Sequence, residues 1–344
     1  MKHVYILGAG FSRPLGGPLF NNLLTMEYWK SHSEKIGLAA EMRDCLELLH
    51  RPGTRPIDEA LGLSSRLNAE ELIALLEWCY LNPNSIRSKL VYEPFPVIAA
   101  KIMSLKDTGR FLRKVYMDLK RLVACQCNTF TQHLEAETDL VAPYVAWLKN
   151  LTPRDTIVSF NYDTAVESIA QTCGIVFPKE VGCYATNTPH LMHVHGCVNW
   201  VLGGDDKITY REYAYSKVVN LSIGLPGIAK ARITENDQIR LLWDSMKHAL
   251  SDADVISIIG YSMPATDNMA RQAILDSLRT GQRVNLVLGN DSFTAGRMQS
   301  LIQPIVGTNS LGVSRIVDMK MYAQDYLPNV NRYHGYDYTV KTSR

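Results

Sequence analysis

Short runs of almost continuous apolar residues recur along the chain, and most of them end at glycine, asparagine or another small polar residue. Such runs, bounded by turn residues, are typical of strands that are buried on both faces. The segments between them carry apolar residues at the spacing of amphipathic helices. This alternation predicts an α/β fold with a parallel sheet that helices cover on both faces. The predicted strands are residues 3–7, 156–160, 191–194, 255–259, 284–288 and 314–317.

A long segment from about Pro18 to Asn150 shows almost no strand pattern. Its apolar residues follow helical spacing, which predicts a helical module inserted into the α/β domain. The predicted helices are residues 38–50, 68–79, 109–148 (one helix or a pair), 237–250 and 266–280. We therefore expect three parts. They are an α/β domain of residues 1–21 together with 151–320, a helical insert of residues 22–150, and a C-terminal tail of residues 321–344.

The first predicted strand runs directly into the turn Gly8-Ala9-Gly10-Phe11-Ser12. One glycine lets the backbone take a conformation that is closed to other residues, and the other removes a Cβ atom that would keep a phosphate from the backbone N–H groups. A helix that starts near Ser12 would direct its free N–H groups and its dipole to the same point. The turn therefore predicts nucleotide binding, although Arg13 stands where the dinucleotide fingerprint has a third glycine. The alternative is an ordinary strand-to-helix turn.

Polar clusters follow the ends of the predicted strands. Ligands of open parallel sheets bind at the carboxyl ends of the strands, so these clusters predict one shared site. The clusters are Gly8–Ser12, Asn161–Asp163, His195, Gly260–Ser262 and Gly289–Asp291.

The composition excludes several classes of protein. With 46% hydrophobic and 20% charged residues, the chain has the composition of a globular protein and not of a disordered one. A formal net charge of +2 gives no reason to expect nucleic acid or a membrane surface as a partner. No apolar run is long enough for a membrane span, and no signal-peptide pattern is present. The seven cysteines include no Cys-x-x-Cys pair, so we expect no zinc site and reduced cysteines in a cytoplasmic protein.

Taken together, the polar clusters resemble the motifs of the sirtuin-like family of NAD-consuming proteins. Sirtuins open with Gly-Ala-Gly-Ile-Ser and then Gly-Ile-Pro-Asp-Phe-Arg, and here Gly8–Ser12 is followed by Gly-Gly-Pro-Leu-Phe-Asn at residues 16–21. The sirtuin motifs Gln-Asn-Ile-Asp, His-Gly-Ser and Gly-Thr-Ser-Leu, and a later strand asparagine, correspond in order to residues 160–163, 195–197, 260–263 and Asn285. The resemblance covers the first twenty residues and roughly 155–295. It implies a sirtuin-like, Rossmann-type sheet.

The chain departs from the sirtuin deacylases in three features. Their zinc module is missing, because no cysteine follows Cys197. The aspartate and arginine of Pro-Asp-Phe-Arg are replaced by Leu19 and Asn21. No acyl-lysine channel is visible. By contrast, Phe-Asn-Tyr-Asp, His-Gly-x-x-Asn-Trp and Gly-Tyr-Ser-x-Pro resemble the sirtuin-like effectors of bacterial antiviral defence, which hydrolyse NAD. The resemblance thus implies NAD as substrate, a role in anti-phage defence, and a separate sensor or activator subunit in a homo- or hetero-oligomer.

The residue types suit cleavage of the nicotinamide–ribose bond. This bond breaks through an oxocarbenium-like ribose and nicotinamide leaves as a neutral base, so orientation, a placed water and charge stabilisation are needed. His195 is the candidate base, Asn161 would orient the water and the ribose, and Asp163 would receive the nicotinamide carboxamide. The other predicted NAD ligands are Gly8, Ala9, Gly10, Phe11 and Ser12 at the phosphates, Gly260, Tyr261 and Ser262 at a phosphate or ribose, and Asn285 at the adenosine ribose.

Alternatives for the individual residues stay open. His193 lies two residues before His195, on the same side of a strand, and is a second candidate for the base. Asn161 and Asp163 could simply cap the following helix. Glu167 fits a solvated helix residue.

Alternatives for the function stay open as well. A protein deacylase would need a tunnel for acyl-lysine beside the nicotinamide site. A non-catalytic sensor would bind NAD or ADP-ribose and leave it intact. Cys197, which follows closely on His195, offers a Cys/His nucleophile, although NAD cleavage does not require a covalent step.

Overall fold

The computed structural model describes residues 1–19, 22–23, 73, 77, 108–217, 219–225 and 233–333. Contacts within the chain divide it into two compact units. The first, here called the sheet unit, consists of Met1–Gly17, Phe130–Val194 and Leu242–Arg344. The second unit consists of Pro18–Thr129 and His195–Leu241. The helix predicted at 38–50 lies outside the described residues, and of the one predicted at 68–79 only Ile73 and Glu77 are described, both of them helical.

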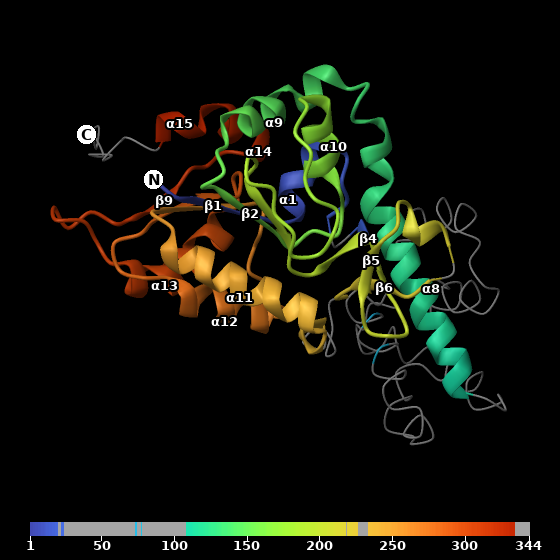
Figure 1. Ribbon diagram of the computed structural model, residues 1–344. Helices are drawn as coiled ribbons and strands as arrows, with labels where there is room; N and C mark the ends of the chain where they lie inside the picture. Colours follow the sequence, from blue (N-terminus) through green and yellow to red (C-terminus); the bar gives the residue numbers. More distant parts are fainter. Residues whose placement is uncertain are drawn as a thin grey trace, which may run out of the picture. The chain divides into compact units, whose positions relative to one another are not determined.

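The sheet unit is built on six parallel strands, each formed by one of the predicted apolar runs (Figure 1). Their order is β3-β2-β1-β7-β8-β9. Numbered along the chain, this is the 3-2-1-4-5-6 order typical of Rossmann-type sheets. The predicted α/β class with a parallel sheet is confirmed. The strands are β1 (His3–Leu7), β2 (Thr156–Ser159), β3 (His190–His193), β7 (Val255–Ile259), β8 (Arg283–Val287) and β9 (Ile316–Asp318).

Helices cover both faces of this sheet, as predicted (Figure 1). On one face lie α9 (Thr138–Asn150), α10 (Ala165–Thr172), α14 (Ala323–Tyr326) and α15 (Val330–Tyr333). On the other face lie α11 (Asp237–Asp252), which begins in the second unit, α12 (Asn268–Ser277) and α13 (Ser292–Val306). A short helix, α1 (Ala9–Ser12), follows β1 directly.

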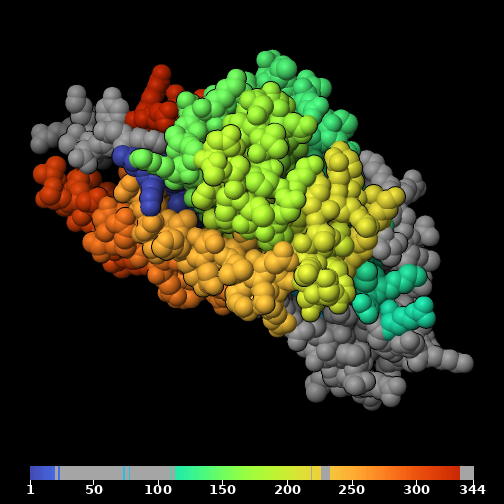
Figure 2. All heavy atoms as spheres, in the orientation of Figure 1, coloured from blue at the N-terminus to red at the C-terminus, as the bar shows by residue number. Residues whose placement is uncertain are grey.

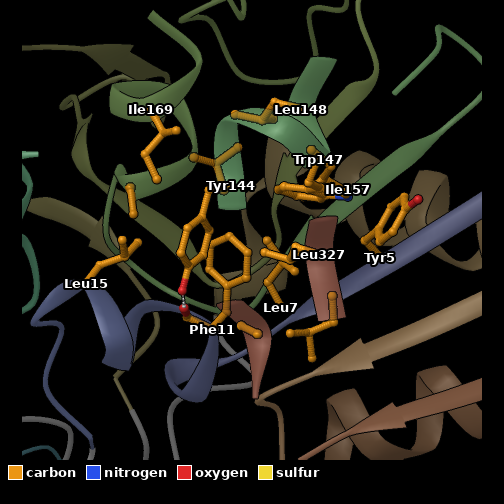
Figure 3. Packing of buried hydrophobic residues seen from close by; sticks show 14 of the residues in the cluster. Tyr5, Leu7, Phe11, Leu15, Tyr144, Trp147, Leu148, Ile157, Ile169 and Leu327 are labelled. Carbon is orange, nitrogen blue, oxygen red and sulfur yellow. Dashed lines mark hydrogen bonds between the residues drawn. The ribbon is translucent and has the colours of Figure 1, made fainter. Parts of the chain in front are cut away.

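Aromatic side chains fill the core between β1 and α9 (Figure 3). The rings of Tyr5 and Trp147 meet edge-on with their centroids 5.2 Å apart, and those of Phe11 and Tyr144 meet in the same way at 5.2 Å. Tyr144 also donates a hydrogen bond of 3.0 Å from its hydroxyl to the carbonyl oxygen of Phe11. Helix α9 is therefore part of the core of the sheet unit. This differs from the predicted division, which assigned all residues up to 150 to the helical insert.

The segment after β9 belongs to the same core. Tyr326 is fully buried, and its hydroxyl lies 2.7 Å from Ser257 Oγ and accepts a hydrogen bond of 3.0 Å from Asn285 Nδ2. Leu327 and Val330 are buried beside it. Residues 323–333 are thus integrated into the sheet unit, whereas the sequence had predicted a tail from residue 321. Residues 334–344 lie outside the described part.

The second unit combines one long helix with a small antiparallel sheet. Helix α8 (Thr108–Asn128) carries Arg121, which is buried, donates to the carbonyl oxygen of Tyr215 (3.1 Å) and pairs with Asp118 (2.8 Å). The helices α8 and α9 together are the pair predicted at 109–148. The sheet, in the order β5-β4-β6, was not predicted. Its strands are β4 (Gly196–Leu202), β5 (Ile208–Tyr210) and β6 (Leu221–Ile223).

The connection between α10 and β3 lies at the surface of the sheet unit (Figure 2), and most of its residues are exposed or half-buried.

Across the described ranges, no helix has both the length and the apolar character needed to cross a membrane.

Candidate functional site

Three strand-end turns meet around β1. This strand pairs with β2 on one side and with β7 on the other, and Leu7 lies level with both Ser159 and Ile259. The three strands therefore end together. β1 is also where the strand order reverses, and ligands of open α/β sheets bind outside the strand ends at such a point. The structure thus brings together the predicted clusters Gly8–Ser12, Asn161–Asp163 and Gly260–Tyr261.

The glycines of the first turn permit a close backbone contact with the turn after β7. A Cβ atom on Gly8 would lie 2.5 Å from the Cα of Tyr261, and one on Gly10 would lie 2.7 Å from the Cα of Gly260. Gly260 itself has a φ of +62°, a conformation that favours glycine. The sequence had predicted a special backbone conformation for one of these glycines and access of a phosphate to the backbone for the other. Contact between the two turns explains them more directly.

Most N–H groups of the first turn are already bonded. Gly8 donates to the carbonyl oxygen of Ile259 (3.0 Å), Gly10 to that of Gly260 (3.0 Å) and Phe11 to that of Gly8 (2.8 Å). Ala9, at the start of α1, has no hydrogen-bond acceptor for its N–H within the described residues. The predicted cradle of free N–H groups is therefore reduced, and Ala9 is the donor that we expect to meet an anion.

Replacing Gly10 with alanine should destabilise the sheet unit, because the new Cβ would press on the backbone of Gly260. We expect a loss of about 1–3 kcal/mol in the free energy of unfolding, the usual cost of overpacking. Gly296→Ala is the matched control, since a Cβ at Gly296, within α13, would meet no atom within 4 Å. The control should be neutral or slightly stabilising. Denaturant unfolding of both variants measures the difference, and equal stabilities would contradict the close-contact explanation.

Asn161 is held by the nitrogen of its side-chain amide and by its backbone. Its Nδ2 donates to the carbonyl oxygen of Gly8 and to Ser12 Oγ, both at 3.0 Å. A carbonyl oxygen can only accept, so this contact fixes which end of the amide is nitrogen. The two amide hydrogens are thereby used. The acceptor atom Oδ1 has no partner among the described residues, so the arrangement presents Asn161 as a hydrogen-bond acceptor.

Asp163 supports this arrangement from the start of α10. Its Oδ2 accepts the hydroxyl hydrogen of Ser12 at 2.9 Å, and its Oδ1 accepts the N–H of Ala165 at 3.0 Å. The second contact matches the helix-capping alternative for Asp163. Burial raises the pKa of Asp163 to about 6, although the hydrogen bonds from Ala165 and Ser12 lower it. The hydrogen bonds therefore run in one direction, from Asn161 to Ser12 to Asp163.

His193, at the end of β3, contacts the same loop. Its Nε2 lies 2.8 Å from Glu167 Oε1 and its Nδ1 lies 3.3 Å from the carbonyl oxygen of Asn161. Burial by itself lowers the pKa of His193, but the charge and hydrogen bond of Glu167 outweigh it and raise the pKa above its usual value. Glu167 thus contacts the site through His193. Its interpretation as a solvated helix residue was incomplete, because its side chain is 30% exposed on α10 but also bonds to His193. No sequence pattern connects these two residues, which lie 26 positions apart.

The turn after β7 is held in part by two residues that the sequence did not single out, Asp267 and Arg297. The ring of Tyr261 stacks on Phe160, with centroids 4.3 Å apart, and its hydroxyl donates to Asp267 Oδ2 at 2.8 Å. Met263 has a positive φ of 48°, which is strained for a side chain of this kind. Arg297, on α13, donates to the carbonyl oxygens of Met263 (3.1 Å) and Ser262. Tyr261 therefore shapes the turn, while Ser262 is exposed beside it.

Asn285 is not brought to this group. It is the third residue of β8, level with Ser257, and it is fully buried. Its amide donates to Tyr326 and to Ser257 Oγ (3.3 Å), and its Oδ1 accepts from Arg283 (3.2 Å). A residue in the middle of a strand and bonded in this way contributes to the core. The prediction that it faces an adenosine ribose has no support in this placement.

His195 begins the part of the second unit that follows β3 in the chain. The residue is buried, and its carbonyl oxygen accepts the N–H of Gly224 at 2.8 Å. Gly196, next to it, has a φ of +83°, and a Cβ there would lie 1.9 Å from the carbonyl oxygen of Ser222. The glycine after His195 is therefore required where β4 meets β6. Cys197, the candidate nucleophile, is buried within β4.

The described site thus consists of a directed series of hydrogen bonds at the switch point of a Rossmann-type sheet, in which Asn161 donates to Ser12 and Ser12 donates to Asp163. Comparison of the amino-acid sequence with protein-family models and with curated proteins found no match.

Proposed function

We propose that this protein is an NAD glycohydrolase of sirtuin-like type. Water would add across the bond between nicotinamide and C1 of the ribose, so that the products are nicotinamide, ADP-ribose and one proton. Support comes from the sirtuin-like order of motifs in the sequence. It also comes from the position of the turns after β1, β2 and β7 at the switch point, where Rossmann-type sheets bind dinucleotides.

The observation that carries this proposal is the fixed orientation of Asn161. With both amide hydrogens donated to Gly8 and Ser12, its Oδ1 can accept a hydrogen bond from the attacking water or from a ribose hydroxyl. An acceptor that is held in place before the substrate binds needs no reorganisation during the reaction. Such a group suits an oxocarbenium-like transition state, in which a neutral base leaves and the water must be in position.

Ser12 and Asp163 would act through Asn161. Both oxygens of Asp163 already accept hydrogen bonds from the protein, so we assign it to positioning and not to the nicotinamide carboxamide. Ser12 Oγ likewise accepts from Asn161 and donates to Asp163. This proposal replaces the role predicted for Ser12 at the phosphates. The phosphates would meet the N–H of Ala9 and the exposed Ser262.

His195 is the proposed general base. An imidazole takes up a proton near neutral pH, and the chain passes from the end of β3 to His195 within two residues. The sirtuin-like defence effectors, which the sequence resembles, suggest an NAD-depleting role and activation by a separate sensor subunit or by self-association. We expect neither a zinc requirement nor nucleic-acid binding.

Replacing Ser12 with alanine should slow catalysis more than it weakens NAD binding. The change removes the link between Asn161 and Asp163, so the amide of Asn161 is no longer fixed. The loss of hydrogen bonds worth about 1 kcal/mol each predicts a fall of roughly ten-fold in kcat with a smaller change in KM. Ser300→Ala is the control, because Ser300 is an exposed residue that donates to the carbonyl oxygen of Gly296 on α13. A rise in KM with unchanged kcat would return Ser12 to a binding role.

A product assay tests the proposed function. The chain is incubated with NAD, with and without an acetylated peptide and candidate partner proteins, and nicotinamide and ADP-ribose are quantified. Hydrolysis predicts equal amounts of both products without any peptide. Nicotinamide release that depends on the peptide would instead identify a deacylase, and NAD that stays bound but intact in every condition would identify a sensor.

A further inference from the structure

His193 has a hydrogen-bond acceptor at each of its ring nitrogens. The residue is buried, with Nε2 at 2.8 Å from Glu167 Oε1 and Nδ1 at 3.3 Å from the carbonyl oxygen of Asn161. A carbonyl oxygen and an ionised carboxylate can only accept hydrogen bonds, so both nitrogens have to donate. This geometry favours an imidazolium ring.

A neutral ring would not fit the same surroundings. If the single hydrogen were on Nε2, the lone pair of Nδ1 would face the carbonyl oxygen of Asn161. If it were on Nδ1, the lone pair of Nε2 would face the carboxylate of Glu167. Either tautomer places two acceptors against each other, so loss of the proton must break one of the two contacts.

The charges around His193 favour the protonated ring. Glu167, on α10, and Asp163, in the loop before that helix, both act on its charge. Both are acidic. They raise the pKa of His193 above its usual value in spite of burial, which lowers it. The contacts should therefore be complete below pH ~6.5 and be lost as the pH rises through the raised pKa.

We propose that His193, protonated and held by Glu167, is a positioning residue for Asn161, and that loss of its proton sets the alkaline limit of activity. The proposal rests on the proposed function, and it assigns the role of base to His195 alone, because a ring that donates from both nitrogens cannot take up a proton. His193 would share the fixing of the Asn161 backbone with Ser159, whose Oγ lies 3.2 Å from the N and 3.4 Å from the O of Asn161.

The first test is the protonation state itself. The full chain is labelled with carbon-13 at the histidine rings and titrated by NMR, and the His193 signal is identified by its loss in His193→Gln. We expect a pKa above about 6.5 in the wild type, lowered by at least about one unit in Glu167→Gln, the usual effect of a nearby opposite charge. A pKa of His193 at or below about 6.5 in the wild type would overturn the proposal. This wild-type titration does not depend on catalysis or on the folding of the Glu167 variant.

The second test is the pH profile of nicotinamide release. Glu167→Gln should shift the alkaline limb of kcat to lower pH by the same amount as the pKa of His193. Glu135→Gln, at an exposed position of the sheet unit, should leave the profile unchanged. If the pKa falls and the limb does not move, His193 has only a structural role. If no condition gives nicotinamide release while the NMR result holds, the proposed function fails independently of the protonation state.

Discussion

Replacing Asn161 with aspartate should reduce nicotinamide release by at least about a hundred-fold, the scale of loss seen when a preorganised polar group in an active site is removed or misplaced. Aspartate has nearly the same shape, but it cannot donate to the carbonyl oxygen of Gly8 or to Ser12 Oγ. A carboxylate would instead stand 3.0 Å from a carbonyl oxygen, where two acceptors repel each other. The orientation of Oδ1 would therefore be lost.

Asn150→Asp is the matched control for this variant. Asn150 also donates from Nδ2 to a backbone carbonyl oxygen, that of Ala146 at 2.9 Å, but it is exposed at the end of α9. Its replacement should leave the rate of nicotinamide release unchanged. Thermal unfolding of both variants separates a catalytic loss from a folding defect. Near-normal release by a folded Asn161→Asp variant would show that the fixed amide is not needed.

Replacing His195 with alanine should lower the rate of nicotinamide release by about a hundred- to ten-thousand-fold, the usual contribution of a general base. Because the residue is buried, His195→Gln provides a second variant that keeps a polar side chain of similar size. Both variants should still bind NAD, since the proposed phosphate and ribose contacts lie elsewhere in the chain.

His248→Ala serves as the control for His195→Ala, because it removes an exposed histidine of α11. The comparison with His193 is the more informative one. If His195 is the base, its loss should lower the rate strongly at every pH, whereas changes at Glu167 should move the pH profile. Full nicotinamide release by a folded His195→Ala variant would contradict the assignment of His195 as the general base.

The strands of the sheet unit could be predicted because they are buried on both faces. A run such as Val255–Ile259 is apolar at almost every position. A short, continuous apolar run of this kind is typical of a strand that is buried on both faces. The strand ends could be predicted for the same reason, since Gly8, Asn161 and Gly260 interrupt such runs. The clustering of these turns followed from the parallel order of the strands.

The division into units could not be predicted from helical spacing. The apolar stripe of α9 looks like that of any amphipathic helix, and nothing in it says that Tyr144 and Trp147 pack on β1 and α1. The small sheet was missed because β5 and β6 are only three residues long and lie among polar turn residues.

The detailed roles within the site depend on contacts between residues that are distant in the sequence. The sequence cannot show whether a glycine is needed for contact with a phosphate or for contact with another segment of the backbone. For Gly10 the structure supports the second reason, because a Cβ there would lie 2.7 Å from the Cα of Gly260. The pairing of His193 with Glu167 has no signature for the same reason. The role of Asn285 at an adenosine ribose came from the resemblance, and no pattern in the sequence shows that its amide bonds to Ser257 and Tyr326 in the core.

The central claim, hydrolysis of NAD by a site centred on Asn161, is tested most directly by carrying out the reaction in water labelled with oxygen-18. The ADP-ribose formed by the wild-type protein, together with any activating partner, is analysed by mass spectrometry beside that from Asn161→Asp. We expect one labelled oxygen in the wild-type ADP-ribose, nicotinamide in equal amount, and almost no product from the variant. Intact NAD recovered from the wild-type protein, or labelled ADP-ribose formed equally well by Asn161→Asp, would contradict it.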